Sequence, residues 1–321
     1  MNVLITGGAG YIGSYTSNIL LDQGHDVTII DNLSTGNASL IPKKAKFYKS
    51  NIQDIKKISK LLKNNNFDII FHFAAFIKVE ESMTNPKKYL KNNYENTKKF
   101  LSICKNNNLN NIIFSSTAAV YGNTNGLRAK ERSKLKPESP YALSKLKVEN
   151  YLKTSNYFKF IILRYFNVAG ADIKLRAGQL SKKPSTHLIK RISEKSIKNG
   201  TIDIYGNNYP SKDGTTIRDY IHVTDLAEAH IQSAKYLLKN RKSNTFNCGY
   251  GKGYSILEVI KSFNSLSKYR IKYKYVNRRA GDVFSVVANA SKIKKVIKWR
   301  PKYNSLKQIL NSSLKWEKKF K

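Results

Sequence analysis

The segment NVLITGGAGYIGS, residues 2–14, is the most informative in the chain. An apolar run leads into Gly7, Gly10 and Gly13, and an amphipathic helical pattern follows at once. Glycines in such a turn permit a tight bend, let backbone N–H groups approach a diphosphate and let the helix pack closely on the strand. The spacing is G-x-x-G-x-x-G, a variant of the simpler G-x-G-x-x-G pattern. The segment therefore predicts the first strand, turn and helix of a dinucleotide-binding domain.

An acidic residue follows at the distance that such a site requires. Asp31 ends the second predicted strand, about twenty residues beyond the glycines, where a carboxylate accepts hydrogen bonds from the adenosine ribose of NAD. The same carboxylate would repel a 2′-phosphate. Asp31 alone also suits a turn or a helix cap. Taken with the strand, the glycines and the helix, it favours NAD as the cofactor.

Short apolar runs alternate with helical patterns through the first half of the chain. The predicted strands are residues 2–6, 26–30, 45–50, 67–73, 111–116 and 159–166, and the predicted helices are residues 11–23, 53–64, 86–107 and 140–154. This order is typical of parallel strands joined by crossover helices. It predicts an α/β fold with a doubly wound parallel Rossmann sheet, whose ligands lie over the carboxyl ends of the strands.

The pattern changes after Asn167. Helices are expected at residues 186–200, 225–240, 255–267 and in two segments beyond 291, with extended segments at 202–206 and 271–276. We expect a smaller C-terminal α/β substrate-binding lobe. The predicted division is an NAD-binding domain of residues 1–167 plus 221–246 and a lobe of residues 168–220 plus 247–321.

The composition is strongly basic. The 321 residues include 58 Lys and Arg against 21 Asp and Glu, a formal net charge of +37. Such a charge suggests nucleic acid or polyphosphate ligands. However, the basic residues are spread over the whole chain and accompany asparagine runs, which indicates compositional drift and a solvated surface. We expect weak, salt-dependent attraction to nucleic acid but no specific nucleic-acid partner.

Two further observations concern location. Cys104 and Cys248 have no metal-ligand spacing and no neighbouring cysteine, so we expect idle thiols in a reducing compartment and no metal site. The N-terminus begins directly with the first strand, and no apolar stretch approaches membrane-spanning length. These features predict a cytoplasmic protein without a membrane association.

The motif Tyr-x-x-x-Lys occurs three times, at Tyr94, Tyr141 and Tyr303. A phenol with a pKa near ~10 is a poor base unless a nearby positive charge stabilises its anion. Tyr141 meets this condition, because Lys145 lies one helical turn away, just after the fifth strand. The strand ends in hydroxyl residues, including Thr117, over the expected nicotinamide site. The other two pairs lie elsewhere and are interpreted as surface pairs.

At this point the sequence resembles a known family. The blocks TGGAGYIGS, HFAAFIKVEES, FSSTAAVYG, PYALSK, LRYFNVAGA, DGTTIRDYIHVTDLAEAH and RRAGDV follow the order and spacing seen in UDP-glucose 4-epimerases, which are extended short-chain dehydrogenases/reductases. The resemblance covers nearly the whole chain. It implies an isomerase of galactose metabolism that interconverts UDP-galactose and UDP-glucose, holds NAD tightly, recycles it, and works as a homodimer.

The resemblance also implies a mechanism. Tyr141 would take the proton of the sugar 4-hydroxyl while C4 gives a hydride to NAD, which produces a 4-keto sugar. This sugar would swing about its diphosphate and accept the hydride on its other face. Thr117 would bond the sugar O4, and Lys145 would hold the nicotinamide ribose and keep Tyr141 acidic.

Further residues match the ligand contacts of the family. The residues that match the cofactor contacts, besides Tyr141 and Lys145, are Gly7, Gly10, Tyr11, Ile12, Gly13, Asp31, Asn32, Asn51, Ile52, Phe73, Ala74, Ala75, Asn92, Ser115 and Tyr165. The residues that match the UDP-sugar contacts, besides Thr117 and Tyr141, are Asn167, His187, Leu188, Tyr205, Arg218, Arg279, Asp282 and Val286. Taken singly, an arginine would be a solvated cation and His187 a surface histidine.

The chain departs from the family pattern at a few positions. Asn51 stands where an aspartate is usual, so the adenine amino group would meet an amide oxygen. Ile77 stands where some members carry a lysine, and Lys190 replaces a common proline. Val286 occupies a position where a bulky tyrosine excludes N-acetyl sugars. We therefore expect UDP-GalNAc and UDP-GlcNAc to be accepted as well.

Two alternatives remain. A nucleotide-sugar 4,6-dehydratase or decarboxylase uses the same scaffold, but a dehydratase needs an acid pair directly after the catalytic threonine. Here Ala118 and Ala119 follow Thr117. The other alternative is a non-catalytic Rossmann protein that senses NAD or binds nucleic acid, which the net charge of +37 would suit. Such proteins typically lose the tyrosine or the lysine, and this chain keeps both.

Overall fold

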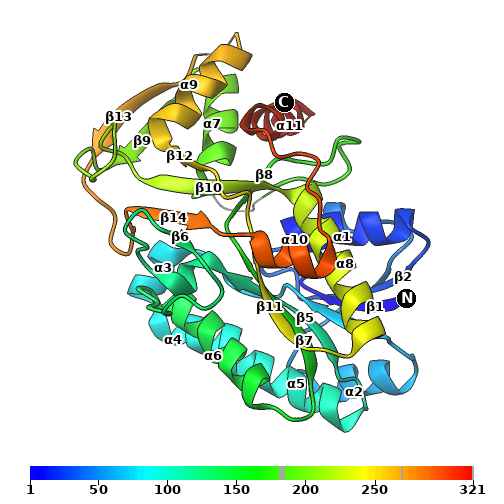
Figure 1. The fold of residues 1–321 in the computed structure, drawn as a ribbon. Helices are drawn as coiled ribbons and strands as arrows, with labels where there is room; N and C mark the ends of the chain where they lie inside the picture. Colours follow the sequence, from blue (N-terminus) through cyan, green and yellow to red (C-terminus); the bar gives the residue numbers. More distant parts are fainter. Residues whose placement is uncertain (181–184, 269, 320–321) are drawn as a thin grey trace.

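The computed structural model describes residues 1–180, 185–268 and 270–319. Its largest element is a seven-stranded sheet in the order β11-β7-β5-β4-β1-β2-β3, in which all neighbours run parallel (Figure 1). The strands are β1 (Asn2–Thr6), β2 (Asp26–Asp31), β3 (Lys46–Lys49), β4 (Ile69–His72), β5 (Asn111–Thr117), β7 (Lys159–Tyr165) and β11 (Asn244–Cys248). Because β1 lies between β2 and β4, the strand order reverses beside β1, and ligands of such sheets bind at that point.

The predicted α/β fold with a doubly wound sheet is confirmed, and all six predicted strands belong to the large sheet. The seventh strand, β11, was not predicted. Its sequence NTFNC is mostly polar and contains no apolar run, so nothing in these residues indicates a strand. It becomes a strand because its backbone extends the ladder at the edge of β7.

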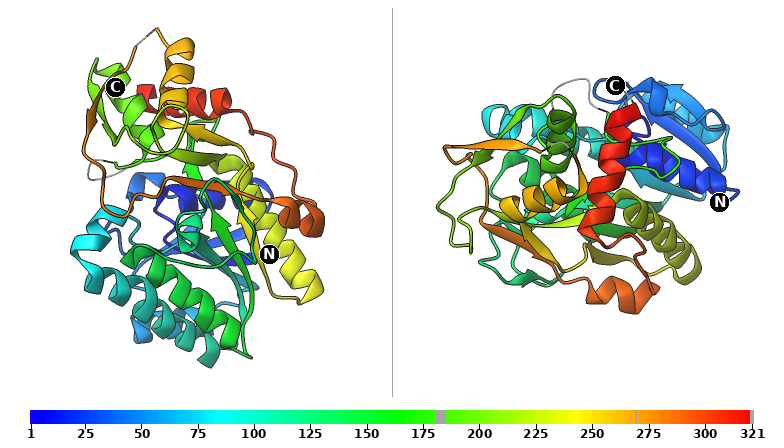
Figure 2. Two further views of the ribbon diagram at one scale, coloured as in Figure 1. Left: turned by 60° about the vertical axis from the view of Figure 1, so that its left-hand side comes forward. Right: turned by 90° about the horizontal axis from the view of Figure 1, so that it is seen from above.

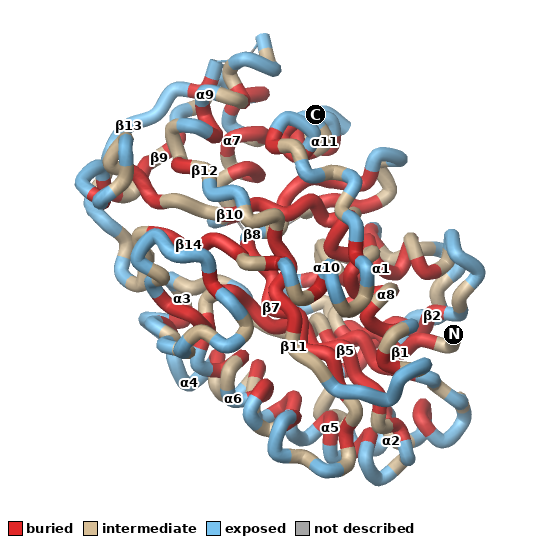
Figure 3. The backbone as a smooth tube through the Cα atoms, viewed as in Figure 1, coloured by how far each residue is buried: buried red, intermediate tan, exposed pale blue. Residues whose placement is uncertain are grey.

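Helices cover both faces of this sheet (Figure 1). Helices α1 (Tyr11–Asp22) and α8 (Val223–Asn240) pack together on one face, and α2 (Ile55–Lys63), α5 (Asn96–Asn106) and α6 (Pro140–Thr154) cover the other. Side chains alternate between the two layers as strand geometry requires. Val3 and Ile5 belong to the core under α8, and Leu4 belongs to the core under α2 and α5. The inner strands of the sheet form the buried centre in Figure 3, whereas β3 at its edge is exposed.

One helix differs from its prediction in detail. The segment predicted as one helix over residues 86–107 consists of α4 (Pro86–Tyr89), a π-helical turn (Leu90–Glu95) and α5. The π turn contains Asn93, which is buried. The side chain of Asn93 accepts the N–H of Phe76 at 2.8 Å and donates to the Ser144 hydroxyl at 3.1 Å. The turn therefore ties the segment after β4 to α6, and π turns often accompany functional sites.

The second half of the chain forms two smaller sheets (Figures 1 and 2). One contains β12 (Gly253–Ser255), β10 (Ile217–His222), β14 (Ser285–Ala288) and β6 (Arg128–Ala129), with β8 (Asn167–Ala169) also on β10. The other pairs β9 (Thr201–Tyr205) with β13 (Lys272–Val276). Helices α7 (Leu188–Ile197), α9 (Ile256–Leu266) and α11 (Leu306–Lys319) pack against one another over this region. Two short helices, α3 (Val79–Thr84) and α10 (Ser291–Ile297), complete the architecture.

The predicted domain boundaries stay a prediction. The sheet pairing shows that β11 ends at Cys248, two residues beyond the expected limit of 246, and that β6 leaves the first half of the chain to join the second sheet. Cys104 and Cys248 are buried. Within the described residues, no helix combines the length and the apolar character needed to cross a membrane.

Candidate active site

The glycine turn packs directly against the end of β4. Gly7 has φ +76°, and a Cβ there would lie 2.6 Å from the backbone nitrogen of Ala74. A Cβ on Gly13 would collide with the carbonyl oxygen of Gly7. The turn is therefore possible only with glycine at these two positions. It brings the ends of β1 and β4 together where the strand order reverses.

Helix α1 begins at this turn, and no side chain caps the free N–H groups of its first turn. Gly10 is the N-cap, and the first turn contains no acidic residue. Such a helix start favours a bound anion, and the glycines leave room for it to approach. This arrangement fits the diphosphate of a dinucleotide. The hydroxyl of Tyr11 instead points to the other lobe and donates to the carbonyl of Gly170 at 2.5 Å.

Asp31 is held at the end of β2 by the glycine turn itself. Its carboxylate accepts the N–H of Ala9 at 3.0 Å and that of Leu33 at 2.8 Å, and the residue is 8 % exposed. Beside it, the amide of Asn32 donates to the side-chain oxygen of Asn51 at 2.7 Å. The predicted ribose and adenine residues thus form one hydrogen-bonded group next to the turn, and this places a fixed carboxylate where NAD needs one.

Tyr141, Lys145 and Thr117 meet at the start of α6 and the end of β5. Ser139 caps α6, because its hydroxyl accepts the N–H of Ala142 at 3.2 Å. The ammonium of Lys145 is buried and donates to the carbonyl of Ser115 at 2.7 Å. The Thr117 side chain forms a hydrogen bond with the half-buried Tyr141. The structure therefore brings the three predicted catalytic residues to one place.

Burial shifts the pKa values of this group. It raises the pKa of Tyr141, and the hydrogen bond with Thr117 lowers it. Burial also lowers the pKa of Lys145 to about 7. The phenol is thus neutral at pH 7, and the ammonium of Lys145 loses its proton close to this pH. A bound cofactor or substrate that supplies charge here would change the protonation of both groups.

The remaining cofactor residues line the same edge of the sheet. The hydroxyls of Ser115 and Tyr165, on β5 and β7, are hydrogen-bonded to each other. Phe73 and Ala75 flank Ala74 after β4, and the ring of Phe73 lies 4.8 Å from that of His230 on α8. The other predicted members, Ile12, Ile52 and Asn92, lie on α1, after β3 and in the π turn.

A second cluster of predicted residues surrounds Asp282. Its carboxylate lies 3.1 Å from the Nη2 of Arg279 and 3.8 Å from the Nη2 of Arg218. The guanidinium of Arg279 also stacks over the ring of Tyr205, at 4.5 Å from its centroid. Val286 pairs with Arg218 across β14 and β10 and is 6 % exposed. Two guanidinium groups that share one carboxylate keep a positive charge available for an anion.

Other contacts bring this cluster to the first. Gly281 lies against α3, since a Cβ there would be 3.5 Å from Val79. A cavity of about 620 Å³ extends between the Arg278–Phe284 loop and Glu138, which precedes α6. The arginine cluster thus lies beside α3 and faces the segment that leads into α6. Asn167 begins β8, where it is exposed.

His187 and Lys78 form part of this region. His187 is the N-cap of α7, directly before Leu188, and its Nδ1 is hydrogen-bonded to Gln179. The pKa of His187 is lowered to about 4, mainly by burial and also by the charges of Arg279 and Lys78. Lys78 was not among the predicted residues, and the structure places its charge near His187.

The fold and this site define a dinucleotide-binding enzyme with a Tyr-Lys pair. The model of the NAD dependent epimerase/dehydratase family matches residues 3–249. A UDP-glucose 4-epimerase of Lactobacillus helveticus is 38% identical over 99% of this chain and 97% of its own length. The chain belongs to the NAD dependent epimerase/dehydratase family, among relatives that are UDP-glucose 4-epimerases.

Solved structures agree with this assignment. The UDP-glucose 4-epimerase of Bifidobacterium longum, in complex with NAD+ and UDP, has a TM-score of 0.94 and 33% identity and covers 99% of this chain and 98% of its own. The UDP-Glc/GlcNAc 4-epimerase of Campylobacter jejuni is 41% identical, with a TM-score of 0.84 and 99% coverage of both chains.

Proposed function

We propose that this protein is a UDP-glucose 4-epimerase that interconverts UDP-galactose and UDP-glucose. The observation that carries the proposal is the meeting of Thr117, Tyr141 and Lys145 at the end of β5, two strands away from β1 and its glycine turn. The alternative dehydratase lacks support, since Ala118 and Ala119 provide no acid at the positions after Thr117. A non-catalytic role has no use for the complete Thr, Tyr and Lys set.

The cofactor is NAD, and the residues around the glycine turn fit it. Gly7, Gly10, Gly13 and the start of α1 would hold the diphosphate, and Asp31 would accept the adenosine ribose hydroxyls. When bound, NAD supplies an acceptor for a hydride from C4 of the sugar and returns that hydride to the ketone. We expect NAD to stay bound through the reaction.

Side chains of the protein would transfer the proton of the sugar 4-hydroxyl. The phenolate oxygen of Tyr141 would take the proton of the sugar 4-hydroxyl and later return it, and the Thr117 hydroxyl would bond O4. Tyr141 can act as this base only if its pKa, which burial raises, is lowered again. The positive charges of Lys145 and of the oxidised cofactor would lower it. Lys145 would also hold the nicotinamide ribose.

The second cluster would bind the nucleotide. Arg218 and Arg279 would hold the diphosphate with forked donors, and Asp282 would accept the uridine ribose once the arginines turn to the phosphates. The remaining contacts to sugar, phosphate and uracil would come from Asn167, His187, Leu188 and Tyr205. A firm grip on the nucleotide leaves the sugar free to turn over between the two half-reactions.

We also propose that the enzyme accepts UDP-GlcNAc and UDP-GalNAc. Val286 is small where a bulky residue would fill the space for an acetamide, and the Campylobacter jejuni relative is a UDP-Glc/GlcNAc 4-epimerase. A Val286→Tyr variant should lose turnover of UDP-GlcNAc and keep that of UDP-glucose. Failure of the wild-type enzyme to convert either N-acetyl sugar, with brisk turnover of UDP-galactose, would reject this substrate range.

The proposed assembly is a homodimer, and the proposed location is the cytoplasm. The first rests on the resemblance to the family, and the second rests on the two isolated cysteines, which suit a reducing compartment. Light scattering coupled to size exclusion would decide the first, because a monomer would have a mass near 36.6 kDa and a dimer twice that value.

The direct test of the proposed function uses the purified protein with UDP-galactose and no added cofactor. The anomeric NMR signals of UDP-glucose should appear, and a Tyr141→Phe variant should produce none. Absence of product even after NAD is added would contradict the proposal. The motifs would then serve another sugar or binding alone.

A further inference from the structure

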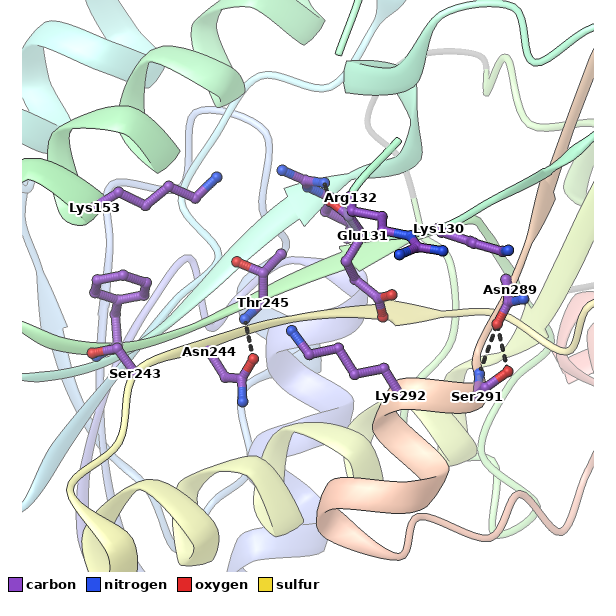
Figure 4. A pocket seen from close by; sticks show the side chains of 12 residues that line it. Lys130, Glu131, Arg132, Lys153, Ser243, Asn244, Thr245, Asn289, Ser291 and Lys292 are labelled. Carbon is purple, nitrogen blue, oxygen red and sulfur yellow. Dashed lines mark hydrogen bonds between the residues drawn. The ribbon is translucent and has the colours of Figure 1, made fainter. Parts of the chain in front are cut away.

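A second cavity lies away from the candidate active site. It has a volume of about 810 Å³ and lies along the β11 edge of the large sheet, between the end of α6 and the start of α10 (Figure 4). The residues that line it include Thr245 of β11, Asn289 before α10 and Phe160 of β7. None of the predicted cofactor or substrate residues lines this cavity.

The cavity is strongly positive. Five cationic side chains and one carboxylate line it, and these are Lys130, Arg132, Lys153, Arg164, Lys292 and Glu131. Two of the cations share one carboxylate, because Arg164 and Lys153 lie 2.5 and 3.0 Å from Glu149. Within the part of the chain that the structure describes, Lys130, Arg132 and Lys292 form no ion pair. Three cations thus face one carboxylate, and the local charge is unbalanced.

Lys292 shares this cavity with other charged side chains. Burial lowers the pKa of Lys292, Glu131 raises it, and the charges of Arg164 and Lys153 lower it. The side chains of Lys292, on α10, and Lys153, on α6, both extend toward the cavity (Figure 4). Like charges that converge on one space repel each other unless an anion enters between them.

The donors define the chemistry of the anion. The guanidinium of Arg132 offers paired N–H donors in one plane, and the lysine ammonium groups offer compact charges. This combination suits phosphate oxygens. Ser243, Thr245 and Ser291 add hydroxyls around the same space. The five cations come from four separate segments, so a ligand that reaches them all must carry several charges. We propose that this cavity binds an oligophosphate anion, independently of the UDP-sugar site.

The test measures binding of sodium tripolyphosphate to the NAD-loaded protein by calorimetry, at ~0.15 M salt so that distant charges are screened. UDP at about ten times its dissociation constant fills the substrate site. A Lys130→Ala/Arg132→Ala/Lys292→Ala variant should bind tripolyphosphate roughly tenfold more weakly or worse, since three ionic contacts of a few-fold each are lost. A Glu131→Gln variant should bind it more tightly, because it removes the one unpaired carboxylate and keeps an acceptor for the N–H of Asn247.

The matched control removes equal charge elsewhere. Lys56, Lys60 and Lys63 lie exposed on α2, and a triple alanine variant there should change the affinity less than twofold. Equal weakening in both triple variants would show attraction by net charge alone and overturn the proposal. So would absence of binding to the wild-type protein at millimolar tripolyphosphate, or an unchanged affinity in Glu131→Gln. UDP-galactose turnover, measured in parallel, tests the proposed function separately, because none of the substituted residues belongs to that site.

Discussion

Glu149 and Arg164 form a bidentate ion pair inside the fold. The Nε and Nη2 of Arg164 lie 2.9 and 2.5 Å from the two carboxylate oxygens of Glu149, and neither side chain is more than 1% exposed. Glu149 also accepts the hydroxyl of Ser116 at 2.6 Å, next to Thr117, and lies one helical turn beyond Lys145. The pair therefore ties α6 to β5 and β7 directly beneath the candidate catalytic residues.

We expect Glu149→Gln to destabilise the protein by about 3–5 kcal/mol, because it leaves the buried charge of Arg164 without a partner. Urea unfolding followed by circular dichroism would measure it. Lys153→Gln is the control, since Lys153 contacts the same carboxylate from a position that is 37% exposed, and it should cost less than about 1 kcal/mol. Similar losses in both variants would contradict the role given to the buried pair.

Gly7→Ala should destabilise the protein and remove bound NAD. Its φ of +76° strains any side chain, and the new Cβ would also lie 2.6 Å from the backbone of Ala74. Gly24→Ala separates the two causes, because Gly24 has φ +74° with no atom within 4 Å of a Cβ. The control should lose only about 1–2 kcal/mol and keep NAD. Equal stability of the two variants, or full NAD content in Gly7→Ala, would show that the close approach has no effect.

Asp219 should make stability depend on pH. Its pKa is raised to about 6, because the effect of burial exceeds the opposite effect of the hydrogen bonds from the N–H groups of Tyr250, Gly251 and Ala288. Since the folded pKa is above the unfolded value, Asp219 contributes stability that is fully present below about pH 4 and is lost as the pH rises through 6. Between pH 4 and 6 the wild-type protein should lose on the order of 2 kcal/mol relative to Asp219→Asn. If the stability of the wild-type protein minus that of Asp219→Asn stays constant or rises between pH 4 and 6, the raised pKa of Asp219 is wrong.

Arg279→Lys should weaken UDP binding about tenfold, because a lysine cannot provide the forked pair of donors that a diphosphate takes from arginine. The NAD content should not change. Arg278→Lys is the neighbouring control, since Arg278 is engaged with Asn208 and stacks on Tyr209, at 4.1 Å from the ring centroid. Calorimetry with UDP would compare the two variants. A larger loss of UDP affinity in Arg278→Lys would show that Arg278, and not Arg279, binds the diphosphate.

Much of the cofactor region was predictable because its signals are local. The glycine turn, Asp31 and the Tyr141 helix each depend on residues close in sequence, and most strands of the large sheet contain a short apolar run. The π turn was missed because its extra residue leaves the helical pattern nearly unchanged.

The sequence by itself determined the parallel sheet, the dinucleotide turn and the spacing of Tyr141 and Lys145, since these follow from the periodicity and chemistry of neighbouring residues. Only the tertiary structure decided the rest. Strands as short as β6 and β14 carry no periodic signal, and they exist because distant backbones pair there. The Glu149–Arg164 pair and the group formed by Arg218, Arg279 and Asp282 join side chains from separate elements. Charges of this kind find their partners only when folding brings the elements together and removes the water between them.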